Sequence, residues 1–227
     1  MRMSRKRNPG EPSYEMSGTR LEATTDSTYL GIIIQHDLGW EKQTQHAVTK
    51  ATRVLNFIKH DFYMCSKSVK ERLYLTLVRP HLEYGVAAWN PYKNCHQSAL
   101  EKVQRRAARF VQGDYKRVSS VTEMLCSLGW ERLTDRRETH QVTQLYKIIN
   151  QDIDIDSSDH LKPKLQRNRR GNNTQFDIPH FTSTAYSNSF FPRTTRLWND
   201  LPQDIIDIPT HKTFRDSYLD YIIKDKN

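Results

Sequence analysis

Apolar residues recur every three or four positions through the middle of this 227-residue chain, which is the spacing of amphipathic helices. The first run, residues 40–62, predicts a long helix. Its polar face includes Lys42, Lys50 and Arg53. A second run begins at a serine cap and reaches Pro80, which should end or kink that helix. Later runs predict further helices over residues 97–112, 120–129 and 130–150.

The first 36 residues follow a different pattern, with short alternating and β-branched stretches. Residues 14–23 predict a small hairpin with Gly18 in its turn. Residues 29–34 predict a strand that is buried, because β-branched residues dominate it. We therefore expect a small β element ahead of the helices.

The pattern loosens after residue 150. Residues 152–159 are acidic and residues 162–170 are rich in cations, so residues 151–183 are interpreted as a polar linker or loop. Helices are expected again at 194–199 and from Thr213, within a small region 184–227. The fold class predicted is mainly α: a helical bundle over 37–150, a β-hairpin and strand element over 1–36, and a less regular C-terminal region.

Charge and composition narrow the functional classes. The chain carries 35 Lys and Arg against 26 Asp and Glu, a formal net charge of +9, and its mean hydropathy is −0.80. A basic excess of this size favours polyanionic partners through counterion release. No apolar run approaches the length of a membrane span, and the three cysteines form no CxxC pair. We expect an intracellular protein, in the nucleus or cytoplasm, without a membrane partner.

Catalytic and metal-binding patterns are missing from the sequence. There is no Asp-Asp pair of the kind that two-metal phosphoryl transfer uses, and no Walker loop, GxGxxG or nucleophile elbow. The series that begins at Asp152 imitates a calcium loop, but Ser157 replaces its glycine and Pro163 its final glutamate. Cys95 and His96 are adjacent, which argues against a shared zinc ion. No catalytic residue, metal ligand or cofactor is predicted.

The helix predicted over 97–112 has two contrasting faces. Its apolar stripe consists of Leu100, Val103, Ala107 and Phe110. Nearly opposite, a basic stripe is formed at i, i+3, i+4 and i+7 by Lys102, Arg105, Arg106 and Arg109. Such a stripe can meet a row of phosphates. Two alternatives are a solvated face without a partner, and pairing of the arginines with acids such as Glu101 or Glu123.

Several segments, in order along the chain, carry a family resemblance. They resemble the region downstream of the polymerase core in non-LTR (LINE-type, jockey-like) retrotransposon reverse transcriptases. The matching segments are LVRPHLEY at 77–84, WNP at 89–91, LEKVQRRAARF at 100–110, SVTEML at 120–125, WERL at 130–133, RR at 136–137, YKI at 146–148, SFFPRT at 189–194 and WNDLP at 198–202.

The resemblance implies a thumb-like helical domain that holds the template–primer duplex, made of RNA and DNA, through phosphate contacts. The contact residues expected are Lys102, Arg105, Arg106 and Arg109, with Arg117 as support. Four phosphate contacts would make log K fall with log salt at a slope of about −3.

The same resemblance implies a primer-grip-like hairpin at Tyr29, Leu30 and Gly31, in which the backbone and Gly31 would touch the strand. The side chains of Tyr29 and Leu30 are expected in the core. Residues 1–36 would be a remnant of the palm and this hairpin. The catalytic aspartates, which hold the divalent metals of a complete enzyme, would lie upstream.

These expectations describe a C-terminal reverse transcriptase fragment that binds template–primer and does not polymerise alone. Two alternatives stay open: a stand-alone helical nucleic-acid-binding protein, and a non-functional remnant of a retroelement reading frame. The four tryptophans are interpreted as packing anchors rather than base-stacking platforms: Trp40, Trp89, Trp130 and Trp198.

Overall fold

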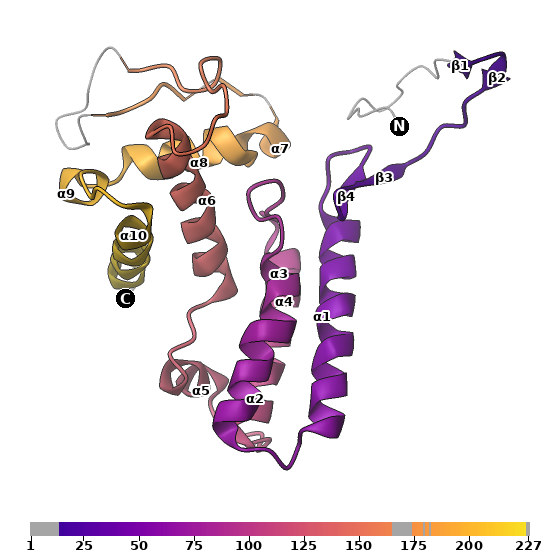
Figure 1. Cartoon of the computed structure of the whole chain (residues 1–227), viewed down its shortest axis with the longest axis vertical. Helices are drawn as coiled ribbons and strands as arrows, with labels where there is room; N and C mark the ends of the chain where they lie inside the picture. Colours follow the sequence, from indigo (N-terminus) through magenta and orange to yellow (C-terminus); the bar gives the residue numbers. More distant parts are fainter. Residues whose placement is uncertain (1–13, 165–173, 179, 182, 226–227) are drawn as a thin grey trace.

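The structure, a computed structural model, describes residues 14–164, 174–178, 180–181 and 183–225. The predicted fold class is confirmed: these residues form a mainly helical structure preceded by two small antiparallel hairpins (Figure 1). The N-terminal basic residues and most of the cation-rich run 162–170 lie outside the described residues. No helix of the described part is long and apolar enough to cross a membrane.

Both hairpins turn at residues with positive φ. Strands β1 (Glu15–Met16) and β2 (Thr19–Arg20) pair around Gly18, whose φ is 76°, so the first predicted hairpin is confirmed. Strands β3 (Asp26–Tyr29) and β4 (Ile32–Gln35) pair in register and enclose a two-residue turn. Leu30 and Gly31 have φ of 46° and 76°, the left-handed conformation that tight hairpin turns require.

Two expectations about this hairpin were wrong. Residues 29–34 form a turn and the ends of two strands rather than one strand, because the chain reverses at Leu30–Gly31. The side chains of Tyr29 and Leu30 are exposed by 67% and 73%, rather than in the core, because they lie at the hairpin tip.

The long helix α1 (Glu41–Asp61) is followed by a helical run with a change of winding. This run consists of α2 (Lys67–Leu73), the π-helical turn η1 (Tyr74–Val78) and α3 (Arg79–Glu83). Pro80, which has no N–H to donate to the preceding turn, lies in the first turn of α3, and the π turn comes immediately before. The predicted kink thus takes the form of a wider turn within a continuing helix.

The next three helices lie where the sequence predicts them: α4 (Asn94–Gln112), α5 (Val121–Ser127) and α6 (Leu133–Ile149). Gly113 ends α4 with a φ of 68°. The predicted cap of α5 is confirmed, since the backbone N–H of Glu123 donates to the Ser120 hydroxyl at 3.3 Å.

The C-terminal region contains more helix than predicted. It comprises α7 (Thr184–Ser187), α8 (Phe190–Asn199), α9 (Gln203–Ile206) and α10 (His211–Asp225). Helix α8 begins four residues before the predicted start at Thr194. Its first turn includes Pro192, which is acceptable early in a helix.

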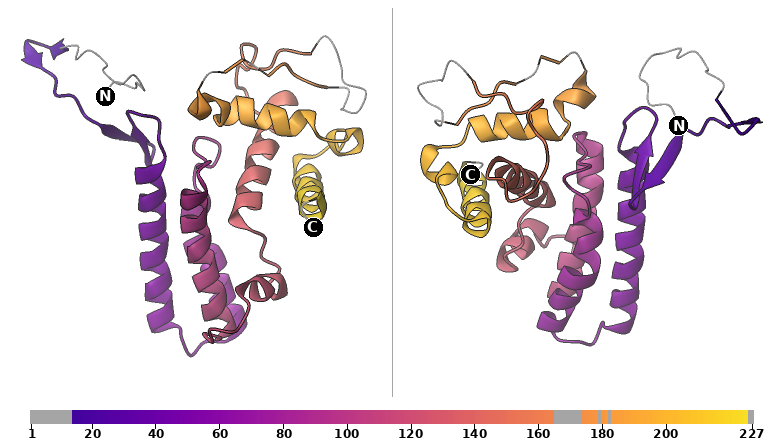
Figure 2. Two further views of the ribbon diagram at one scale, coloured as in Figure 1. Left: turned by 180° about the vertical axis from the view of Figure 1, so that it is seen from behind. Right: turned by 45° about the horizontal axis from the view of Figure 1, so that its top comes forward.

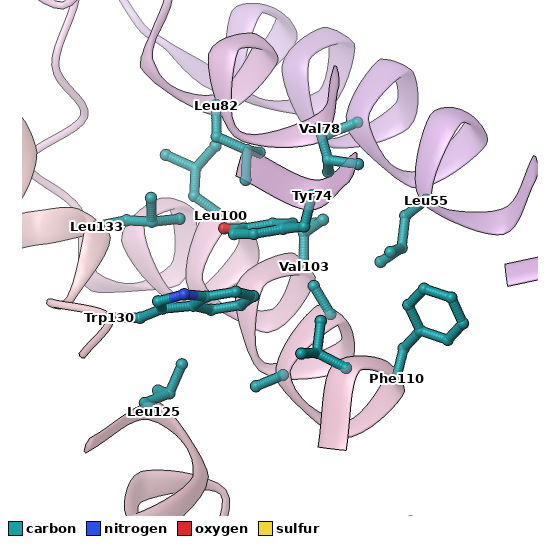
Figure 3. Packing of buried hydrophobic residues seen from close by; sticks show 14 of the residues in the cluster. Leu55, Tyr74, Val78, Leu82, Leu100, Val103, Phe110, Leu125, Trp130 and Leu133 are labelled. Atoms are coloured by element: carbon teal, nitrogen blue, oxygen red, sulfur yellow. The ribbon is translucent and has the colours of Figure 1, made fainter. Parts of the chain in front are cut away.

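Buried side chains form two hydrophobic clusters. The first joins α1, η1, α3, α4 and α5 with Leu133 at the start of α6, and in it the Tyr74 ring stacks on Trp130 at a centroid distance of 4.3 Å (Figure 3). The second begins at Val142 in the later part of α6 and includes α8, α9 and α10. Helix α6 therefore belongs to both clusters, and in the ribbon it lies between α4 and α10 (Figure 2).

Three tryptophans are buried at the centre of these clusters, namely Trp89, Trp130 and Trp198, and the ring of Trp40 packs against the first cluster. The prediction that all four are packing anchors is confirmed.

Candidate nucleic-acid interface

The four cations of the basic stripe on α4 divide into two rows with different surroundings. The outer row, Lys102 and Arg106, is exposed to solvent on the side of α1. The inner row, Arg105 and Arg109, is only half-exposed. In the described part of the chain, no carboxylate lies within ion-pair distance of these four side chains, so pairing with Glu101 or Glu123 does not hold them.

Arg106 connects the outer row to α1. Its Nη2 donates to the Asn56 side-chain oxygen at 3.1 Å. Lys59, one turn further along α1, is close enough that burial and the charge of Arg106 together lower its pKa. Two cations held this close favour a shared anionic partner.

Arg109 makes its hydrogen bonds within the protein. Its guanidinium donates to the backbone oxygens of Asp114, Lys116 and Ser119, at 3.4, 2.9 and 3.3 Å. These bonds fasten the loop between α4 and α5 to the end of α4. Most of its donors are therefore engaged, and Arg109 has little capacity left for a phosphate.

Arg105 faces a hollow of about 800 Å³ between α4, α5 and the start of α6, which Glu101 and Asp135 also line. Burial raises the pKa of Glu101, while a bond from the Leu133 N–H and the charge of Arg105 lower it. Because both basic and acidic side chains line this hollow, its charge does not favour an anionic ligand. Arg117, the expected supporting residue, is exposed in the loop after α4.

A second basic region lies on α1, which stands at the outer edge of the molecule in every view (Figures 1 and 2). A hollow of about 750 Å³ follows its exposed face and is lined by four basic side chains: Lys42, His46, Lys50 and Arg53. Glu41 is the acidic residue of this lining. Lys42, Lys50 and Arg53 lie on the polar face that the sequence predicts for this helix, but the sequence offers no reason to prefer them to the stripe on α4.

The two basic regions adjoin one another on the exposed side of α1, where Arg53 lies one turn before Asn56. Gln45 and Thr49 line the hollow, and Asn56, which accepts from Arg106, lies on the same side of the helix at i+11 from Gln45. We call the combined region the α1/α4 basic surface. It consists of Arg53, Lys59, Lys102 and Arg106. Lys50, nine residues before Lys59, lies on the opposite flank of α1, near His81 of α3.

The β3–β4 hairpin is fastened to the beginning of α1. The Ile33 N–H donates to the Gln43 side-chain oxygen and the Lys42 N–H to that of Gln35, both at 2.9 Å. The Lys42 ammonium also pairs with Asp26. The hairpin therefore has a fixed position at one end of the basic surface.

The tip of this hairpin is partly covered. The Tyr84 hydroxyl donates to the Leu30 carbonyl at 2.9 Å, and a Cβ on Gly31 would lie 3.6 Å from the Tyr84 ring. A strand that approached the Gly31 backbone, as the resemblance implies, would share this place with Tyr84. The exposed side chains of Tyr29 and Leu30 are accessible instead.

Two other arginines form hydrogen bonds and ion pairs inside the protein. Arg137 is 2% exposed and donates to Asn90 and to the carbonyls of Leu82 and Trp89, and its guanidinium lies 4.2 Å from the Trp89 ring centroid. Arg136 forms ion pairs with Glu83 and Glu131. Neither is available to a ligand.

The described residues contain no group of three or more His, Cys, Asp or Glu side chains that could hold a metal ion. Cys65, Cys95 and Cys126 are free thiols. In comparisons with known proteins, no protein-family model, no curated protein and no solved structure matches this chain.

Proposed function

We propose that this chain is the C-terminal, thumb-like part of a retrotransposon RNA-directed DNA polymerase, and that it binds the template–primer duplex without polymerising by itself. The observation that carries the proposal is the α1/α4 basic surface, which continues from the β3–β4 hairpin along two packed helices. The ordered resemblance described above supplies the polymerase context.

The shape of this surface suits a phosphate backbone. Helix α1 has 21 residues, so it is about 30 Å long, close to one turn of a nucleic-acid duplex. Its cations are side chains on rigid helices, which can contact phosphates without reading base sequence. Such contacts position a duplex and leave sequence selection to base pairing.

The proposed contact residues differ from the four cations of the stripe on α4. Lys102 and Arg106 remain, because they are exposed. Arg53 and Lys59 are added. Four phosphate contacts would give a slope of log K against log salt of about −3. Arg109 is assigned to the support of its loop rather than to the duplex.

The test is binding to an RNA–DNA hybrid over a series of salt concentrations. The triple variant Arg53→Glu, Lys102→Glu and Arg106→Glu should lose binding, because it replaces three attractive contacts by repulsive ones. A matched control makes the same charge change at exposed cations elsewhere, with Lys67→Glu, Lys212→Glu and Arg215→Glu. Equal loss in both variants would mean that net charge alone drives binding, and the site assignment would be wrong.

Two separate experiments test whether the chain polymerises and whether it comes from a polymerase. We expect no primer extension by the purified chain with magnesium and nucleotides, because its sequence has no Asp-Asp pair of the kind that two-metal phosphoryl transfer uses. The DNA immediately upstream of the coding sequence discriminates between the alternatives. Reverse transcriptase coding sequence there supports the fragment, whereas its absence favours a stand-alone nucleic-acid-binding protein. Lack of any hybrid binding by folded protein would favour a non-functional remnant.

A further inference from the structure

The loop between α4 and α5 presents an aromatic ring and two cations to solvent. The side chain of Tyr115 is 58% exposed, and Lys116 and Arg117, which follow it, are exposed as well. Val118, the next residue, is 92% exposed. None of these four side chains is among the residues that form the two hydrophobic clusters. Packing of the core therefore does not explain why the loop carries them.

Hydrogen bonds give this loop a defined conformation. The Arg109 guanidinium donates to the backbone oxygens of Asp114, Lys116 and Ser119. Within the loop, the Asp114 carboxylate accepts from the Lys116 N–H at 2.9 Å. A loop that is ordered in the free protein loses little conformational entropy when its exposed side chains bind a ligand. The loop is thus prepared to hold Tyr115 in place for a partner.

The Tyr115 ring lies beside the end of α1. The Lys59 ammonium is 5.2 Å from the centroid of this ring, in a cation–π contact. Because Lys59 belongs to the α1/α4 basic surface, the aromatic ring and the cations of that surface meet at this point. An aromatic ring next to an ammonium group matches the two parts of a nucleotide, which are a planar base and a phosphate.

This point lies at the opposite end of α1 from the β3–β4 hairpin. The hairpin is bonded to Gln43 in the first turn of α1, whereas Lys59 lies in its last turn. These two residues are about 24 Å apart along the helix axis. In Figure 1 the hairpin lies at the upper end of α1, and α1 ends at the bottom of the view. The basic surface therefore has the hairpin at one end and the Tyr115 ring at the other.

We propose that Tyr115 stacks on an unpaired base where a single strand leaves the bound duplex, while Lys59 and Arg117 contact the phosphates of that strand. The inference rests on the proposed function, because it extends a surface that binds a duplex. Stacking on an aromatic ring tolerates every base, so the loop would bind the strand without reading its sequence. The tryptophans offer no such ring, because three are buried and Trp40 packs against the first cluster.

The experiment compares a blunt RNA–DNA hybrid with the same hybrid carrying a short single-stranded extension. The readout is the ratio of the two affinities, and the wild type should prefer the extended hybrid. Tyr115→Leu should lower this ratio at least about fivefold, which is the lower limit for loss of one base–aromatic stack. Tyr115→Phe keeps a ring and should keep the ratio. Tyr186→Leu, at an exposed position in the C-terminal region, is the matched control and should also keep it.

Two further measurements examine the base and the phosphates separately. A fluorescent adenine analogue in the extension should be quenched when the wild type binds, and not when Tyr115→Leu binds, because quenching requires stacking. Arg117→Gln should reduce the salt slope of extended-hybrid binding by about 0.7, the contribution of one single-strand phosphate, and reduce that of the blunt hybrid by less. An equal reduction for both hybrids would contradict the contact between Arg117 and the extension.

These measurements distinguish failure of the inference from failure of the proposed function. If both hybrids bind and Tyr115→Leu leaves the ratio unchanged, the proposed function stands and the stacking site is wrong. If neither hybrid binds, the proposed function is wrong, and only binding of a single-stranded oligonucleotide that Tyr115→Leu weakens would still support the stacking site. A changed oligomeric state of Tyr115→Leu with an unchanged ratio would assign the loop to a contact between two copies of the chain and overturn the inference.

Discussion

The outer and inner rows of α4 carry the same kind of side chain one turn apart, yet they have different roles. In the outer row, Lys102 and Arg106 face α1 across an exposed seam. In the inner row, Arg109 is bound to three backbone oxygens of the next loop, and Arg105 shares a hollow with acidic residues. A row of cations in a sequence therefore does not define a single surface.

The two rows differ in their surroundings because different elements lie beside them. Helix α1 packs beside the outer row and brings further cations, so charge accumulates there. The loop that follows α4 folds back over the inner row and offers carbonyl oxygens, which consume guanidinium donors. Arg137 on α6 is engaged within the protein more completely than Arg109, because all its side-chain nitrogens donate to buried acceptors.

The largest effect is expected for Arg137→Leu, which tests whether internal arginines are structural. The substitution leaves the acceptors of Leu82, Trp89 and Asn90 without a donor in a buried place. We expect a loss of about 3–5 kcal/mol in the free energy of unfolding, measured by urea denaturation. The control Arg53→Leu, at an exposed position on α1, should change stability by less than about 0.5 kcal/mol. A small effect of Arg137→Leu would remove the distinction between internal and external cations.

An intermediate effect is expected when the two rows are compared directly. Arg109→Gln should lower the free energy of unfolding by about 1–2 kcal/mol, because the loop loses three hydrogen bonds from a charged donor. Arg106→Gln removes one exposed contact and should change stability little, while it reduces the salt slope of hybrid binding by about one. Equal effects of the two variants on both measurements would contradict the division into rows.

The helices could be predicted from the sequence because their signals are local. The apolar period of α1, α4 and α6 and the serine cap of α5 each depend on residues within a few positions. The hairpin at Leu30–Gly31 was implied by the resemblance alone, because the β-branched residues that follow indicated one continuous strand. A leucine also seldom adopts the positive φ that the turn requires.

The candidate site was only partly predictable, because its composition depends on packing between distant segments. The stripe on α4 was visible at helical spacing, but nothing local to Arg109 shows that the loop after Gly113 returns to it. Likewise, the sequence does not show that Asn56 of α1 meets Arg106, 50 positions later. Such contacts decide which cations are exposed, and they come from the tertiary structure.

The smallest effect concerns Glu101, the acidic neighbour of the inner row. Its carboxylate accepts from the Leu133 N–H at 3.0 Å and so caps α6 from α4, but burial raises its pKa. A raised carboxyl pKa means that the folded state holds the proton more tightly than the unfolded state. This contribution therefore favours folding at acidic pH and is lost as pH rises from the unfolded pKa through the folded one.

Glu101→Gln keeps an oxygen for the Leu133 N–H and removes the titration. We expect the variant to be as stable as the wild type at neutral pH, or more stable by less than about 1 kcal/mol, and to lack this decline in stability above acidic pH. Unfolding curves over a pH series measure both quantities. Glu123→Gln on α5 removes one exposed carboxylate and serves as the control. A loss of stability at neutral pH with an unchanged pH profile would instead mean that the charge of Glu101 stabilises α6. The inner row would then be half-buried because of ionic interactions rather than hydrogen bonds with neutral acceptors.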